Sequence, residues 1–228
     1  MQIKINNLVL KYDGEVVLKV DDIVFDGVLG LTGGLASGKS SLLKAIAGLE
    51  QIESGSICFD GTQMATLNPK KRNVSLINID TFLFLNKNAI FNLQFPLKKR
   101  GFSQDQIGRL TEQSAAEFDI DFLNTKTKNL SDKQKIDLLF ARATIKNPTI
   151  LLVDEFDNLC PKLKLSNQSQ TYFYDRLKST IAANKQKNKN FCAIIVSKDL
   201  TIIAPLADNM LTLKCGKILS LKSRPKTN

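Results

Sequence analysis

The sequence predicts an α/β fold with a mostly parallel core sheet, an N-terminal antiparallel β subdomain and a helical subdomain. Three observations predict it. A glycine-rich loop lies between a short apolar run and an amphipathic segment, the order of strand, loop and helix. Two apolar runs, Ile150–Val153 and Cys192–Val196, are continuous, as in parallel strands buried on both faces. Strand-like and helix-like segments alternate along the chain, which favours a parallel sheet.

The first part of the chain predicts the antiparallel subdomain. Residues 2–11 and 16–25 alternate apolar and polar residues, and Asp13-Gly14 between them is typical of a hairpin turn. Residues 28–32 form the apolar strand before the loop. Residues 39–48 follow as a helix that Gly48 ends, and residues 56–59 and 74–79 are further strands.

The second part of the chain predicts the helices and a final hairpin. Residues 87–147 are mostly helical, and this stretch is the expected helical subdomain. Ser103–Gln106 and Ser131–Gln134 each have the order of a capping box. Residues 168–187 form a polar helix, and residues 210–213 and 218–221 pair as a hairpin. With 228 residues, the chain is expected to form one domain over 1–228.

Composition narrows the class of protein. The net charge is +10, but the basic residues are spread widely and lack interleaved aromatics, so solvated surface is favoured over a nucleic-acid or anionic-membrane face. We therefore do not expect nucleic acid as a partner. No apolar run approaches the ~20 residues that span a bilayer. Without a signal-peptide pattern at the N-terminus, we expect a cytoplasmic protein.

The glycine-rich segment fits the pattern G-x-x-x-x-G-K-[ST], which wraps phosphates. Glycine allows backbone N–H groups to curl around an anion, and the following helix adds the positive end of its dipole. Lys39 is expected to reach the β- and γ-phosphates and to serve catalysis, and Ser40 to bind magnesium. A chance glycine turn is disfavoured by the strand before it and the helix after it. The expected phosphate-binding residues are Gly33, Gly34, Leu35, Ala36, Ser37, Gly38, Lys39, Ser40 and Ser41.

Two acids end the apolar run at residues 150–153. Alone they are weak evidence, because many strands end in an acid. Together with the phosphate loop they predict a site for ATP and Mg²⁺, in which Asp154 holds the metal, through water, and Glu155 polarises the attacking water.

These motifs and their surroundings resemble the nucleotide-binding subunits of ATP-binding-cassette (ABC) transporters. Residues 27–33, 41–49 and 54–57 are similar to that family around the loop. Residues 92–101 and 158–164 resemble importer-type members, the latter those of the sugar and polyamine group. That group usually has a C-terminal regulatory domain, and this sequence ends before one could fit.

The resemblance implies an assembly and a place in the cell. The partners would be membrane permease subunits and a second ABC ATP-binding subunit, in a homodimer or a heterodimer. The protein would lie on the cytoplasmic face of the inner or plasma membrane. Tyr12 stands where family members stack an aromatic ring on adenine.

Several family positions carry other residues. Ile79 stands at the Q-loop glutamine, and Asn78 could replace it only if the strand register shifts by one. The signature L-S-G-G-Q is Leu130–Gln134 here, with Asp132 and Lys133 in place of the two glycines. Asp132 favours the helix by about 0.3–1 kcal/mol but should oppose an incoming phosphate. A merely well-capped helix is an equally good interpretation of this segment.

Three further positions differ. Lys198 stands at the switch histidine and could contact a γ-phosphate, but it lacks an acceptor to orient water. Cys160 aligns with the D-loop aspartate. Ala36 replaces the third glycine of the loop, which costs roughly 1–2 kcal/mol if that position needs a positive φ.

Three hypotheses follow. The first is an ATP-binding transport subunit that hydrolyses MgATP weakly alone and works with a partner that has an intact signature. The second is a regulatory pseudoenzyme that binds nucleotide with little or no hydrolysis; the altered positions favour it, and the retained Glu155 argues against it. The third is a nucleic-acid-associated ATPase, which the net charge suggests and the length disfavours.

Overall fold

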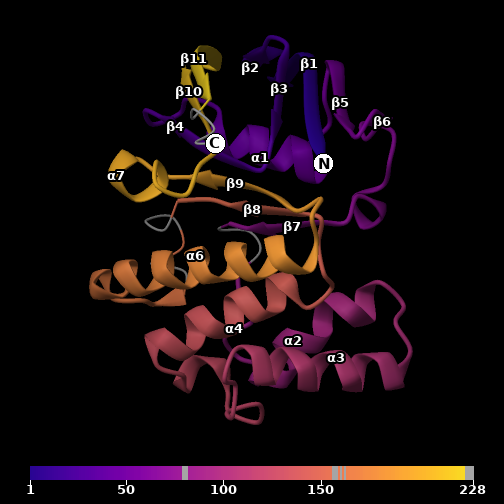
Figure 1. Ribbon diagram of the computed structural model, residues 1–228, viewed down its shortest axis with the longest axis vertical. Coiled ribbons are helices and arrows are strands. Elements are labelled where there is room, and N and C mark those ends of the chain that lie inside the picture. The colour runs from indigo at the N-terminus through magenta and orange to yellow at the C-terminus, as the bar shows by residue number, and fades with distance from the viewer. Residues whose placement is uncertain (79–81, 156–158, 160, 162, 224–228) are drawn as a thin grey trace. The chain divides into compact units, whose positions relative to one another are not determined.

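The computed structural model describes residues 1–78, 82–155, 159, 161 and 163–223. Within these residues the chain divides into two compact units. The first comprises the described residues among 1–76, 149–155 and 187–228, and the second comprises those among 77–148 and 156–186. Figure 1 shows the elements of both.

The N-terminal strands of the first unit pair antiparallel. β1 pairs with β2, β3 and β5, and β5 pairs with β6. This arrangement confirms the predicted antiparallel subdomain. The strands are β1 (Gln2–Tyr12), β2 (Glu15–Val20), β3 (Ile23–Asp26), β5 (Ser54–Phe59) and β6 (Thr62–Gln63).

The remaining strands form the mostly parallel part of the sheet. The pairs β10 with β4, β4 with β9, and β8 with β9 are parallel, and β10 with β11 is an antiparallel hairpin. In the described residues the sheet has eleven strands, in the order β6-β5-β1-β2-β11-β10-β4-β9-β8-β7, with β3 paired to β1. The strands are β4 (Val28–Gly33), β7 (Val74–Ile77), β8 (Ile150–Val153), β9 (Cys192–Val196), β10 (Asn209–Lys214) and β11 (Lys217–Ser223).

The predicted strand at residues 16–25 is two strands, β2 and β3. Asp21 and Asp22 separate them, and aspartate is depleted in strands. Asp22 Oδ1 accepts hydrogen bonds from the backbone N and the side-chain Nδ2 of Asn7 at 3.1 and 3.2 Å. β2 and β3 therefore pair one after the other with the same edge of β1, while β5 pairs with the opposite edge.

Helix α1 (Lys39–Ala47) packs into the hydrophobic core of the first unit. Leu42, Leu43 and Ile46 are fully buried and cluster with apolar side chains of β1, β4 and β8. Gly48 ends the helix, as predicted, and it does so in the left-handed conformation with φ 77°. This packing fixes the helix start at the end of β4, where the phosphate loop lies.

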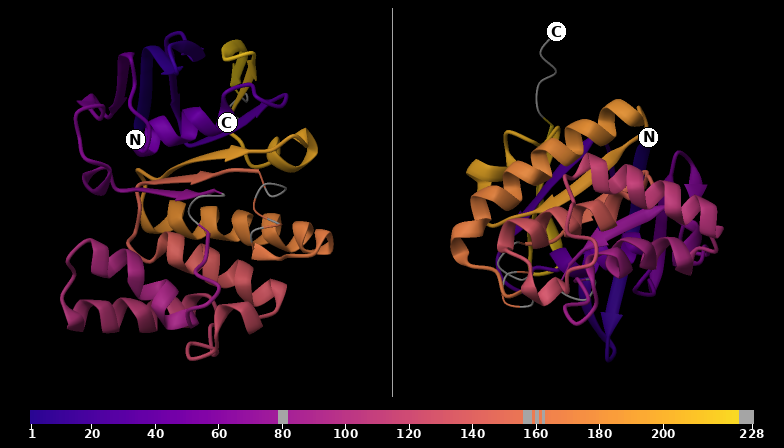
Figure 2. Two further views of the ribbon diagram at one scale, coloured as in Figure 1. Left: turned by 180° about the vertical axis from the view of Figure 1, so that it is seen from behind. Right: turned by 90° about the horizontal axis from the view of Figure 1, so that it is seen from below.

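The described part of the second unit is helical. α2 (Ala89–Lys99), α3 (Gln104–Glu117) and α4 (Asp132–Thr144) contact one another and lie side by side in Figure 1 and in both views of Figure 2. α6 (Gln170–Lys187) follows the 3₁₀ turn η3 (Asn167–Ser169). The capping boxes at Ser103 and Ser131 are both present, as predicted. Among the described residues, no helix is long and apolar enough to cross a bilayer.

Candidate nucleotide-binding site

The phosphate loop runs from the end of β4 to the start of α1. Gly33 has φ 150°, and a Cβ atom there would collide with the carbonyl oxygen of Leu213. Gly38 has φ 93°, and a Cβ atom there would lie 2.7 Å from the side chain of Leu18. The glycines are therefore required by backbone conformation and by the close approach of neighbouring strands.

Ala36 also has a positive φ, 56°. The sequence predicts a strain cost if this position needs a positive φ, and it does. The Cβ atom of Ala36 therefore costs roughly 1–2 kcal/mol. The strain lies inside the segment that must wrap an anion. Leu35 beside it is 92% exposed, so its side chain contributes little to the core.

Lys39 folds back over the loop. Its Nζ donates hydrogen bonds to the carbonyl oxygens of Gly33 at 2.9 Å and Gly34 at 2.8 Å. It also lies 3.4 Å from Ser37 Oγ and 3.2 Å from Glu155 Oε1. The lysine side chain is only 7% exposed, so this ammonium group is well defined and faces the loop.

Ser40 and the acid pair meet beside the lysine. Ser40 Oγ donates to Asp154 Oδ2 at 3.0 Å, and the backbone N of Glu155 donates to Asp154 Oδ1 at 3.0 Å. Burial raises the pKa of Asp154, and these hydrogen bonds oppose the rise. β8 thus delivers its two carboxylates to the N-terminus of α1, although they are far from it in the sequence.

Lys198 reaches the same carboxylate from the end of β9. Its Nζ lies 3.0 Å from Glu155 Oε2, so Glu155 is held between two lysines, one on each oxygen. The turn that carries Lys198 is fixed by a hydrogen bond from the backbone N of Asp199 to Ser197 Oγ at 3.0 Å. The sequence predicts a contact of Lys198 with the γ-phosphate, and its ion pair with Glu155 was not predicted.

Tyr12, at the end of β1, lies beside the first turn of α1. Its hydroxyl donates to Ser41 Oγ at 3.4 Å, and the residue is 44% exposed. Burial of the hydroxyl, together with a hydrogen bond to Glu50, raises the pKa of Tyr12. The ring is therefore held by its hydroxyl end while part of its surface faces solvent, an arrangement that suits stacking.

These side chains fit a magnesium nucleotide chemically. The hydroxyl of Ser40 and the carboxylate of Asp154 are the oxygen ligands that Mg²⁺ prefers, and they are already adjacent. The positive-φ loop and Lys39 supply N–H donors and a cation for phosphate oxygens.

The start of α4, in the second unit, is built differently. Ser131 Oγ accepts a hydrogen bond from the backbone N of Gln134, whose side chain accepts one from the backbone N of Ser131. Asp132 Oδ2 accepts from the backbone N of Ser166 at 2.7 Å and from Ser169 Oγ at 2.9 Å. Both altered family positions are thus engaged within the unit, since Lys133 lies over the ring of Tyr172 at 5.2 Å.

Two other predicted departures lie outside the described residues, namely Ile79 and Cys160. Asn78 is described and is 1% exposed.

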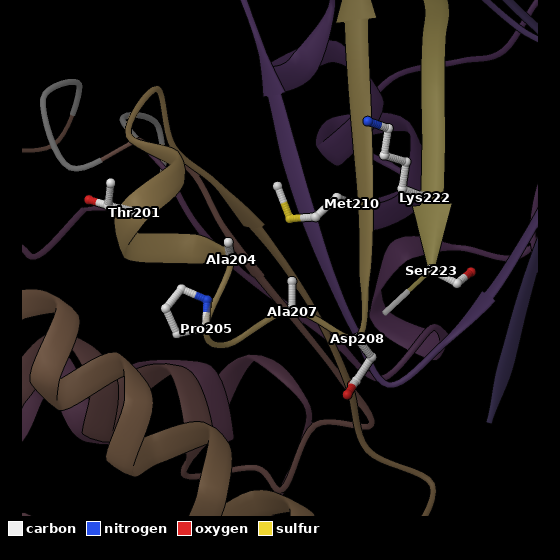
Figure 3. Close-up of a pocket in the computed structure, with 8 residues that line it drawn as sticks. All are labelled: Thr201, Ala204, Pro205, Ala207, Asp208, Met210, Lys222 and Ser223. Carbon is white, nitrogen blue, oxygen red and sulfur yellow. The ribbon is translucent and has the colours of Figure 1, made fainter. Parts of the chain in front are cut away.

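A surface cavity of about 520 Å³ in the first unit is separate from the site (Figure 3). Its lining is mostly small or apolar around Met210, with Asp208 and Lys222 as charged members. One carboxylate oxygen of Asp208, Oδ2, already accepts a hydrogen bond from the backbone N of Val28 at 2.7 Å. The lining residues are Thr201, Ala204, Pro205, Ala207, Asp208, Met210, Lys222 and Ser223, and none of them belongs to the predicted nucleotide site.

The fold, with a phosphate loop between β4 and α1 and acids at the end of β8, is that of a P-loop NTPase. The ABC transporter family model matches residues 22–158. The chain belongs to this family, as the resemblance in its sequence implied. The model for the ATPase family associated with various cellular activities (AAA) matches residues 109–215.

Similar curated proteins are import ATP-binding proteins. The sn-glycerol-3-phosphate import ATP-binding protein UgpC of Pectobacterium atrosepticum is 31% identical over 184 residues, 78% of this chain and 52% of the relative. UgpC 2 of Agrobacterium fabrum is 30% identical over 225 residues, 95% of this chain and 56% of the relative. The chain spans about half the length of the curated relatives it matches.

Solved structures share the fold. A nucleotide-free ATP-binding cassette of an ABC transporter aligns with a TM-score of 0.77 at 17% identity, covering 98% of this chain and 92% of that one. The ATP-binding subunit of an ABC transporter aligns at 0.74 and 20% identity, covering 98% and 90%. The predicted fold class is confirmed.

Proposed function

We propose that this protein is the ATP-binding subunit of an importer, which binds MgATP and couples its hydrolysis, at a rate that can be slow, to transport through a membrane permease. One observation carries the proposal. Ser40, Asp154, Glu155 and Lys39, from two distant segments, form a chain of polar contacts in which each link is 3.2 Å or shorter. In phosphoryl transfer a protein mainly positions groups and offsets developing charge, and these residues can do both.

Each residue has a proposed role. Lys39 and the loop residues 33–41 bind the phosphates, and Tyr12 stacks on adenine. Ser40 and Asp154 would hold Mg²⁺, which when bound neutralises charge on the phosphates. Glu155 accepts a hydrogen bond from the attacking water and orients it, and Lys198 contacts the terminal phosphate.

The proposed setting follows from the relatives. Proteins named as import ATP-binding subunits suggest that this chain serves import of a small solute, on the cytoplasmic face of the membrane, with permease subunits and a second ATP-binding subunit. The permease, rather than this chain, would select the solute. We expect the 1–228 chain to act as one ATP-binding domain with a helical part at about residues 87–147.

A regulatory nucleotide binder is the second candidate, and the start of α4 favours it. Asp132 places a carboxylate in the first turn of the helix whose family counterpart clamps a phosphate. Such a protein would bind ATP and hydrolyse little of it.

Phosphate release at saturating MgATP separates the two candidates. The chain is assayed with its co-purifying partners, and Lys39→Ala and Glu155→Gln are the comparisons. A wild-type rate clearly above both variants supports the transport subunit. A rate equal to both supports the binder, and failure to bind ATP at all rejects both.

A further inference from the structure

The carboxylate of Glu155 occupies an unusual electrostatic position. One oxygen lies 3.2 Å from the ammonium of Lys39 and the other lies 3.0 Å from that of Lys198. The Glu155 and Lys39 side chains are 6% and 7% exposed, whereas the Lys198 side chain is 52% exposed. Glu155 therefore bridges a buried cation and a partly exposed one.

We infer that Glu155 is an internal competitor of the terminal phosphate, and that Lys198 lets the site distinguish a nucleoside triphosphate from a diphosphate. The inference rests on the proposed function. An ammonium group binds carboxylate and phosphate oxygens through the same charge-assisted hydrogen bonds. The two lysines that would hold a terminal phosphate are already paired with the carboxylate, so a triphosphate must displace it from both.

Lys39 and Lys198 differ in which phosphates can compete for them. Lys39 also donates to the carbonyl oxygens of Gly33 and Gly34, so it stays at the loop whichever phosphate is bound. Lys198 comes from the turn after β9, outside the phosphate loop. A diphosphate that fills the loop competes only for Lys39, and the pair between Lys198 and Glu155 can persist. A third phosphate competes for Lys198 as well and frees the carboxylate for water.

This competition also sets the order in which the triphosphate and the attacking water bind. While Glu155 is paired with both lysines, its oxygens are engaged and a water molecule must compete for them. Binding of a triphosphate exchanges one anion for another on the lysines. The carboxylate then becomes available only when the group to be attacked is present. Lys198 is thus a specificity-determining residue.

Nucleotide affinities test the inference without relying on turnover. Dissociation constants are measured by titration calorimetry for MgADP and for the magnesium complex of a non-hydrolysable triphosphate analogue. Glu155→Gln keeps the shape but removes the competing charge. We expect the analogue to bind about tenfold tighter and ADP at most about threefold tighter, the scale of partly buried ion pairs. Glu53→Gln, which removes an exposed carboxylate paired with Lys11, is the matched control and should change neither constant.

A double-mutant cycle tests the part played by Lys198. In the Lys198→Gln background, the gain from Glu155→Gln for the analogue should fall to about threefold, because only the pair with Lys39 remains to be displaced. Lys222→Gln, which removes an exposed lysine of β11, is the control background and should leave the tenfold gain intact. An equal gain with and without Lys198, or an unchanged ratio of analogue to ADP affinity in Glu155→Gln, would overturn the inference while the proposed function stands. A wild-type chain that binds neither nucleotide would overturn both.

Discussion

The starts of α1 and α4, whose counterparts in the family bind phosphates, differ in this protein in their capping and in their charge. α1 begins after Gly38, which has no side chain, and Lys39 to Leu42 in its first turn include no acid. α4 begins after Ser131, whose hydroxyl caps the helix, and Asp132 puts a carboxylate in its first turn. Free N–H groups and a positive dipole end suit an anion at α1, whereas α4 has already satisfied a donor and holds a negative charge.

The comparison teaches that helix stability and anion binding compete at the same atoms. Asp132 accepts hydrogen bonds from Ser166 and Ser169, which link α4 to the segment before α6, and its charge interacts favourably with the dipole of α4. Ala36 shows the reverse at α1, where a strained φ of 56° is kept within the phosphate loop. We therefore propose that the start of α4 is stabilised at the expense of anion binding, and that the start of α1 is shaped for anion binding at the expense of stability.

The largest expected effect is on turnover, at the acid beside α1. Glu155→Gln should lower phosphate release by about two to three orders of magnitude, because the amide cannot take up a proton. Nucleotide binding should be retained. The measurement is steady-state phosphate release at saturating MgATP with the partners present. A variant as active as the wild type would remove Glu155 from the mechanism.

The next effect concerns binding. Lys39→Ala should weaken ATP binding by about 100-fold, since it removes the buried cation of the loop together with its charge-assisted hydrogen bonds to phosphate. Equilibrium dialysis with labelled ATP measures this loss. Lys222→Gln is the control, and equal affinities in the two variants would show that charge in general, not this lysine, binds ATP.

At α4 the expected effect is on stability. Asp132→Ala should lower the free energy of unfolding by about 1–2 kcal/mol, because Ser166 N and Ser169 Oγ lose their acceptor. Denaturant titration measures this change. Asp105→Ala is the matched control, since Asp105 is exposed and is the acid in the first turn of α3, which also begins with a capping box. An equally large loss at Asp105 would show that the helix dipole, not the contact with residues 166–169, is responsible.

The contribution of Asp132 to the free energy of unfolding should depend on pH. Burial raises the pKa of Asp132, but hydrogen bonds from Ser166 and Ser169 and the charge of Lys135 lower it more, so the net shift is downward. A lowered folded-state pKa contributes stability above the unfolded value, about 3.9, and loses it as pH falls through the folded value. The difference in stability between wild type and Asp132→Ala should therefore be constant near neutral pH and shrink below about pH 4.

The smallest expected effect is at Ala36. Ala36→Gly should relieve strain and change the free energy of unfolding by about +0.5 to +1 kcal/mol, since glycine accepts the positive φ but has a more flexible unfolded state. The melting temperature of the nucleotide-free chain reports this. A lower melting temperature would show that the Ala36 methyl group is held by packing and is not a source of strain.

Much of the fold was predictable because periodicity and turn residues are local signals. Residues 150–153 and 192–196 became β8 and β9 with the predicted bounds, and the capping boxes at Ser103 and Ser131 formed as expected. The split between β2 and β3 was missed, although two consecutive polar residues, Asp21 and Asp22, interrupt the apolar alternation there. The placing of β11 between β2 and β10 has no local signal, since it depends on how distant strands pair.

The site was predictable in its residues but not in its contacts. The phosphate-loop pattern and the acids after β8 identified Lys39, Ser40, Asp154 and Glu155 from the sequence. The two lysines on Glu155 were not foreseen, because that geometry requires β4, β8 and β9 to end at the same edge. The hydrogen bonds from Ser166 and Ser169 to Asp132 were not predicted either, because they join segments far apart in the sequence. The two serines shortly before α6 indicated only local capping.

The central claim is that the site at α1 is a working MgATP site despite the altered start of α4. Its most direct test is phosphate release by the wild-type protein with its natural partners, set against Lys39→Ala and Glu155→Gln under the same saturating MgATP. The account predicts a wild-type rate above both variants by at least about tenfold. A wild-type rate equal to that of both variants would contradict it.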